Sequence, residues 1–117
     1  MTSTLDRHLL RSLVMQWQRG EITERDVHER AEHLWDQRDW PDYPTSDARS
    51  IAIEVLAQLD ILNHQLITVE DVPAIVDFLN TPPGSEEDAW EQWQRYWDNV
   101  DLDKRKQALR GHPSYNA

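Results

Sequence analysis

Apolar residues recur at helical spacing along most of the chain. Between residues 5 and 19 they occupy one half of a helical wheel, and the charged and amide side chains occupy the other half. Ser3 or Thr4 precedes this segment as an N-cap, and Gly20 follows it as a stop signal. The pattern predicts an amphipathic helix over residues 5–19. Its apolar positions are Leu5, Leu9, Leu10, Leu13, Val14 and Trp17.

A helix start signal follows at residues 22–27, which read Ile-Thr-Glu-Arg-Asp-Val. Thr23 is a natural N-cap, and Asp26 stands where the acidic partner of a capping box stands. The flanking Ile and Val are placed as a hydrophobic staple. We expect the second helix to run to about Gln37. Its inward-facing residues are Val27, Ala31, Leu34 and Trp35.

Two prolines at three-residue spacing interrupt the pattern within residues 38–46. They stop a helix and favour extended backbone. A third helix is expected from near Asp47 to about Asn63. Its apolar residues nearly surround the helical wheel, which is typical of a helix in the centre of a bundle. These residues are Ile51, Ile53, Val55, Ala57, Leu59, Ile61 and Leu62.

The start signal recurs at residues 67–72, where the order is Ile-Thr-Val-Glu-Asp-Val. Pro73 leaves two N-caps open for the fourth helix. Thr68 as the N-cap would place Pro73 where it deletes an early backbone hydrogen bond, whereas Asp71 would place it in the tolerated first turn. The apolar residues of this helix are Val72, Ile75, Val76 and Leu79.

Residues 81–84, Thr-Pro-Pro-Gly, end the fourth helix, and Ser85 with Asp88 marks the start of a fifth. Three tryptophans form one stripe on the fifth helix, and both a core and an interface role are open for them. A shorter basic helix is expected from Asp101 to Arg110. The stripe contains Trp90, Trp93 and Trp97.

Together these elements predict an all-α, single-domain bundle of five to six helices over residues 1–110 and a C-terminal tail over residues 111–117. A chain of 117 residues is long enough for one core. The repeated start signal is compatible with two tandem helical hairpins followed by the Trp-rich helix. Capping chemistry alone also produces this repetition, so the duplication stays open.

Charge and cysteine content narrow the class of function. The chain has 22 acidic and 12 basic residues, a formal net charge of −10, and no cysteine. The charge argues against binding to nucleic acid or to an anionic membrane and permits a basic partner. The absence of cysteine excludes disulfides and thiolate chemistry. No long apolar run or charged-then-apolar leader stands out, and we expect a cytoplasmic protein.

Histidines and carboxylates raise the question of a metal site. His28 and His33 are five residues apart, which turns them about 140° from each other on a helix and prevents a zincin-type site. Glu29 with His33, and Asp60 with His64, are acid–His pairs at four-residue spacing, whereas the di-iron bundle signature requires three. We therefore expect no metal and no other cofactor.

Enzymatic activity has little support in the sequence. Glu54 and Gln58 lie one turn apart on the otherwise apolar third helix. Such a carboxylate is a general acid or base in some proteins, and more often it hydrogen-bonds a neighbouring element. The chain has no recognisable catalytic triad, P-loop or dinucleotide fingerprint. We expect a protein that is not an enzyme, and the alternative is a metal-dependent enzyme that uses Glu29, His33, Asp60 and His64, or one that uses Glu54.

Two acidic surfaces are candidates for partner binding. The first is the loop at residues 35–44, where aromatic anchors and prolines alternate with carboxylates that favour a basic partner. The second is the polar face of the fifth helix, where carboxylates gather within about 40° of the helical wheel. The cis or trans state of Pro41 and Pro44 stays open. The predicted partner-binding residues are Asp36, Asp39, Trp40, Asp42, Tyr43, Glu87, Glu91 and Asp98.

One stretch of the chain resembles a known family. Residues from about Leu9 to Leu62 resemble the bacterial colicin-D-type family of self-protective immunity proteins. The shared features are the turn Gly-Glu-Ile-Thr at 20–23, the helix end Leu-Trp-Asp at 34–36, and Val-Leu-x-x-Leu-Asp at 55–60. The resemblance covers under half of the chain. It implies a one-to-one inhibitor of a basic ribonuclease-type toxin domain, with carboxylates in place of RNA phosphates.

These observations lead to two hypotheses. The first is an acidic binding protein of the immunity-protein or antitoxin kind, which inhibits or neutralises a basic protein partner such as a nuclease-type toxin. The second is a non-catalytic accessory or scaffold subunit that self-associates through tryptophan. Monomer and small homo-oligomer are both open. Direct nucleic-acid binding is not expected, because residues 104–110 are a small basic patch beside a strongly acidic body.

Overall fold

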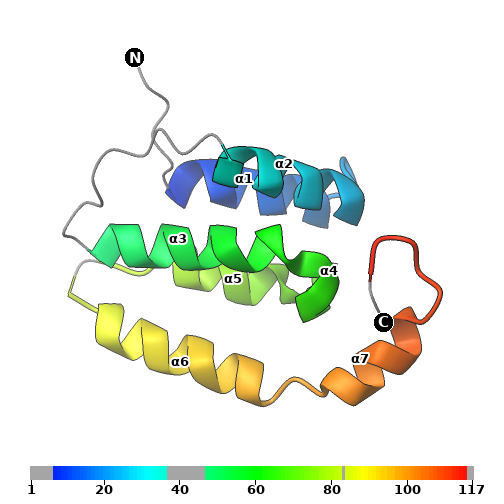
Figure 1. Ribbon diagram of the computed structural model, residues 1–117. Helices are drawn as coiled ribbons and strands as arrows, with labels where there is room; N and C mark the ends of the chain where they lie inside the picture. The colour runs from blue at the N-terminus through cyan, green and yellow to red at the C-terminus, as the bar shows by residue number, and fades with distance from the viewer. Residues whose placement is uncertain (1–6, 37–46, 83, 116–117) are drawn as a thin grey trace.

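The computed structural model describes residues 7–36, 47–82 and 84–115, and within them it contains seven α-helices, one 3₁₀ turn and no strand (Figure 1). The predicted all-α bundle is confirmed. The helices are α1 (Arg7–Gln18), α2 (Glu24–Asp36), α3 (Asp47–Asp60), α4 (Leu62–Gln65), α5 (Val72–Leu79), α6 (Glu86–Asp98) and α7 (Leu102–Leu109), and the 3₁₀ turn is η1 (Val69–Asp71).

The helices are arranged around a middle layer that α3 and α5 form (Figure 1). α1 and α2 cover one side of this layer, and α6 packs on α5 from the other side. The prediction that the third helix is central is confirmed, because α3 contacts α1, α2, α4 and α5. Its core-facing residues are Ile51, Ala52, Val55, Leu56 and Leu59, all of them buried.

The third helix is shorter than predicted. α3 ends at Asp60, and the separate α4 begins at Leu62, so the prediction of one helix to Asn63 is wrong in its last turn. Leu66 then ends α4 in the left-handed conformation with φ of 56°. The apolar period continues through the break, since Leu62 and Leu66 are both buried. Periodicity therefore gave no sign that the chain changes direction here.

The two helix start signals make the same backbone contact. The amide of Thr23 donates to Asp26 Oδ2 at 3.0 Å, and the amide of Thr68 donates to Asp71 Oδ2 at 2.9 Å. After Thr68 the chain forms η1, and Asp71 then takes the N-cap position of α5 with Pro73 in the first turn. Each proposed N-cap thus starts an element, Thr68 the 3₁₀ turn and Asp71 the helix.

The segment after α7 returns to the body of the bundle. Tyr115 is buried, and its hydroxyl donates to the backbone oxygen of Ile67 at 2.5 Å. Burial raises the pKa of this phenol above its usual range. Of the stretch predicted as a tail over residues 111–117, the described part, residues 111–115, lies outside the helices, and Tyr115 anchors it. None of the described helices has the length and apolar character needed to cross a bilayer.

Candidate partner-binding surface

Trp93 fixes the orientation of α6. Its side chain is 4% exposed, and its ring stacks on Phe78 of α5 with 4.3 Å between centroids. Its indole Nε1 donates to Glu54 Oε2 of α3 at 2.9 Å. Glu54 therefore accepts a hydrogen bond from a neighbouring helix, the structural alternative considered for this carboxylate. Gln58 donates to the same oxygen at 3.5 Å.

The other two tryptophans of the stripe pack around this anchor. Trp90 meets Phe78 edge-on with 5.1 Å between centroids, and Trp97 meets Trp93 edge-on with 5.3 Å. Both are partly buried against the core, whereas Trp93 belongs to the core itself. The stripe is thus the core-facing side of α6, and the opposite side of the helix faces solvent.

Three predicted binding residues lie on the exposed side of α6. We call Glu87, Glu91 and Asp98 the acidic ridge, and all three are exposed. Arg95 Nη2 reaches Glu91 Oε2 at 4.0 Å, a pair so long and exposed that it neutralises little. Gln94 donates to Asp98 Oδ1 at 3.0 Å. Among the described residues, Glu87 makes no ion pair or side-chain hydrogen bond.

Helix electrostatics explain only part of this charge. Carboxylates in the first turn of α6 are favoured by the helix dipole, and Glu86 also accepts a hydrogen bond from the amide of Gly84 at 2.9 Å. Asp98 lies in the last turn, where the same dipole disfavours a negative charge. The acidic ridge therefore extends beyond what stabilisation of the helix requires.

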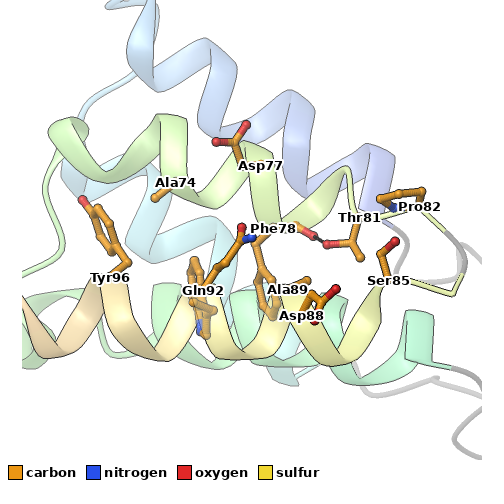
Figure 2. Close-up of a pocket in the computed structure, with 11 residues that line it drawn as sticks. Ala74, Asp77, Phe78, Thr81, Pro82, Ser85, Asp88, Ala89, Gln92 and Tyr96 are labelled. Carbon is orange, nitrogen blue, oxygen red and sulfur yellow. Dashed lines mark hydrogen bonds between the residues drawn. The ribbon is translucent and has the colours of Figure 1, made fainter.

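A groove of about 420 Å³ lies between α5 and α6, and none of the acidic-ridge residues lines it (Figure 2). Asp77 of α5 and Asp88 of α6 are exposed carboxylates of its lining, and in the view of Figure 2 the Asp77 carboxylate points away from α6. Phe78 and Trp93 are nearly buried and supply apolar lining. Such a groove can hold a cation with an apolar stem. The remaining lining residues are Ala74, Thr81, Pro82, Ser85, Ala89, Gln92 and Tyr96.

One end of the groove adjoins a buried ion pair that the sequence analysis missed. Asp71 has no exposed surface, and both of its oxygens accept hydrogen bonds from the Arg105 guanidinium at 2.7 Å. The Tyr96 hydroxyl also donates to Asp71. The hydrogen bond to Asp71 raises the pKa of Arg105, and burial together with Asp71 raises the pKa of Tyr96 to about 12. The pair ties α7 to the start of α5.

The acidic loop that was predicted as the first binding surface is described only at its beginning. Asp36 is exposed at the end of α2. α2 and α6 lie on opposite sides of the α3–α5 layer, so Asp36 is not part of the acidic ridge (Figure 1). The other predicted residues of this loop lie outside the described residues, as do Pro41 and Pro44. They are Asp39, Trp40, Asp42 and Tyr43.

Glu29 and Asp60, the acidic residues of the two acid–His pairs, have different surroundings. Glu29 is exposed and pairs with Arg25 at 3.1 Å, and His33 is exposed. Burial, followed by the nearby Glu32, raises the pKa of Asp60. His28 Nε2 lies 2.9 Å from the backbone oxygen of Asp60 and joins α2 to α3. No group of three or more metal-binding side chains occurs within the part of the chain that the structure describes.

Comparison of the chain with protein-family models, curated proteins and solved structures finds no match.

Proposed function

We propose that this chain is a small acidic binding protein that inhibits or neutralises a basic protein partner in the cytoplasm through the acidic ridge. The observation that carries the proposal is the division of α6 into two sides. Trp93 holds one side in the core, and the other side presents Glu87, Glu91 and Asp98 to solvent. Carboxylates that a formed helix already holds in a row lose little conformational entropy when a partner docks, so the ordering cost of binding is small.

Electrostatics indicate the kind of partner. The net charge of −10 repels nucleic acid and steers a positively charged surface toward the protein. A nuclease-type toxin has such a surface where it binds the phosphates of its nucleic acid, and a row of carboxylates can take the place of those phosphates. The resemblance of residues 9–62 to immunity proteins points to the same class of partner. The alternative, a non-catalytic scaffold subunit that self-associates through tryptophan, has less apolar surface available because Trp93 is buried.

Affinity capture with matched baits tests the proposal. The wild-type bait is compared at low salt with a ridge variant, Glu87→Gln/Glu91→Gln/Asp98→Asn. Exposed ion pairs are each worth up to about 1 kcal/mol, so losing three weakens binding by about tenfold or more. The retained protein is identified by mass spectrometry, and its affinity for each bait is then measured by titration.

The control variant removes three carboxylates elsewhere, by Glu21→Gln/Glu29→Gln/Glu70→Gln, all at exposed positions. It has the same net charge as the ridge variant and should bind the partner almost as the wild type does. Equal weakening by both variants would mean that net charge alone explains the loss of affinity. That result would contradict a ridge-specific interface. Recovery of the chain alone, as a homo-oligomer by sedimentation, would favour the scaffold subunit.

A further inference from the structure

The groove between α5 and α6 has one sign of charge. Asp77 and Asp88 are the acidic residues of its described lining, which includes no Lys, Arg or His (Figure 2). Neither carboxylate forms an ion pair with another described residue. Arg105, near the Tyr96 end, already donates to both oxygens of Asp71. No cation in the part of the chain that the structure describes therefore neutralises the groove.

The lining indicates which cation fits. Ala74 and Ala89, with the nearly buried Phe78 and Trp93, give the groove apolar lining in addition to its two carboxylates. A guanidinium is planar and weakly hydrated, so it enters such surroundings more readily than a strongly hydrated ammonium group. Its five N–H donors also match the oxygen acceptors along the groove. These acceptors belong to Asp77, Thr81, Ser85, Asp88 and Gln92.

We propose that the α5–α6 groove receives an arginine side chain of the basic partner. This inference rests on the proposed function and adds to it the partner side chain that the protein binds. Asp88 directly follows Glu87 of the acidic ridge in α6, about 100° further round the helix, so the groove and the ridge lie on different faces of the same helix. The ridge attracts the partner's basic surface, and the groove selects arginine over lysine by its shape and its apolar lining.

A chemical-shift titration tests the groove directly. The whole chain, labelled with ¹⁵N, is titrated with blocked arginine, blocked lysine and blocked norleucine, each carrying an N-acetyl and a C-terminal amide group. We expect arginine to shift the amides of Thr81, Ala89 and Gln92, lysine to shift them less, and norleucine to leave them unchanged. Asp77→Asn/Asp88→Asn should weaken arginine binding by about tenfold, since it removes two charged hydrogen-bond acceptors.

The matched control is Glu21→Gln/Glu70→Gln, which removes two charges at exposed positions that do not line the groove. It should keep the arginine-induced shifts of the groove residues. Shifts that lysine reproduces, that scatter over the surface, or that survive Asp77→Asn/Asp88→Asn would overturn the inference.

The captured partner separates this inference from the proposed function. If the ridge variant weakens the complex and Asp77→Asn/Asp88→Asn does not, the groove inference is wrong and the proposed function stands. If arginine binds the groove but no variant affects any captured protein, the proposed function fails while the groove remains an arginine site. Weakening by both variants supports both.

Discussion

Asp26 and Asp71 occupy the same position of the same start signal, and their surroundings give them different roles. The carboxylate of Asp26 is bound by the amide and hydroxyl of Thr23, and these hydrogen bonds lower its pKa. Asp71 repeats the amide contact but is fully buried and also binds Arg105 and Tyr96. The local motif can be predicted from sequence. The burial of Asp71 cannot be predicted in this way, because it depends on how α6 and α7 pack against the start of α5.

Removal of Arg105 tests the importance of the buried pair. We expect Arg105→Ala to lower the free energy of unfolding by about 3 kcal/mol, because it leaves a fully buried carboxylate without its cation. Arg105→Lys should restore little of this loss, since an ammonium cannot donate to both oxygens in the same geometry. Urea unfolding measures the change.

Lys104 supplies the control for this prediction. It is the preceding residue of α7, and its side chain is exposed. Lys104→Ala should change the free energy of unfolding by less than about 0.5 kcal/mol. Similar effects of the two alanine variants would mean that the Asp71–Arg105 pair contributes no more than a surface charge does.

At the scale of the element, α6 was predictable as a helix and its tryptophan stripe as one face. The spacing of Trp90, Trp93 and Trp97 did not indicate which of them is central. That depends on Phe78, whose ring stacks on Trp93, and on Glu54, which accepts the indole N–H. Both partners come from other helices. A one-dimensional pattern therefore identifies the face but not the anchor.

Trp93 should contribute most of the binding energy between α6 and the bundle. Trp93→Ala should lower the free energy of unfolding by about 3–5 kcal/mol, because it removes a buried ring and leaves Glu54 without its donor. Trp90→Ala, at a partly buried position of the same helix, should cost clearly less. Thermal unfolding of both variants measures the difference, and equal losses would contradict a single anchor.

At the scale of the whole molecule, the fold gives some charged side chains hydrogen-bond partners on other helices and leaves others exposed to solvent. Arg7 donates to the backbone oxygen of Thr81 at 2.6 Å, and Arg11 donates to the side chain of Asn80, so two cations lie at the C-terminal end of α5. Arg105 forms an ion pair with the buried Asp71. The acidic ridge could be predicted from one helical wheel. The groove could not, since it exists only where α5 and α6 meet.

This distribution of charge predicts that salt acts oppositely on folding and on binding. Carboxylates of a chain with net charge −10 repel one another, and salt screens that repulsion. Raising sodium chloride from low concentration to about 0.15 M should therefore raise the melting temperature of the free protein. The same change should slow association with the basic partner by about tenfold or more, because it screens the steering attraction. Calorimetry and stopped-flow mixing measure the two effects.

The ridge variant, Glu87→Gln/Glu91→Gln/Asp98→Asn, sharpens this prediction because it lowers the magnitude of the net charge by three. Its melting temperature should depend less on salt than that of the wild type, and so should its association rate. A wild-type association rate that is independent of salt would contradict electrostatic steering by the acidic ridge. A melting temperature that falls as salt rises would mean that internal ion pairs such as Asp71–Arg105 outweigh the repulsion among the surface carboxylates.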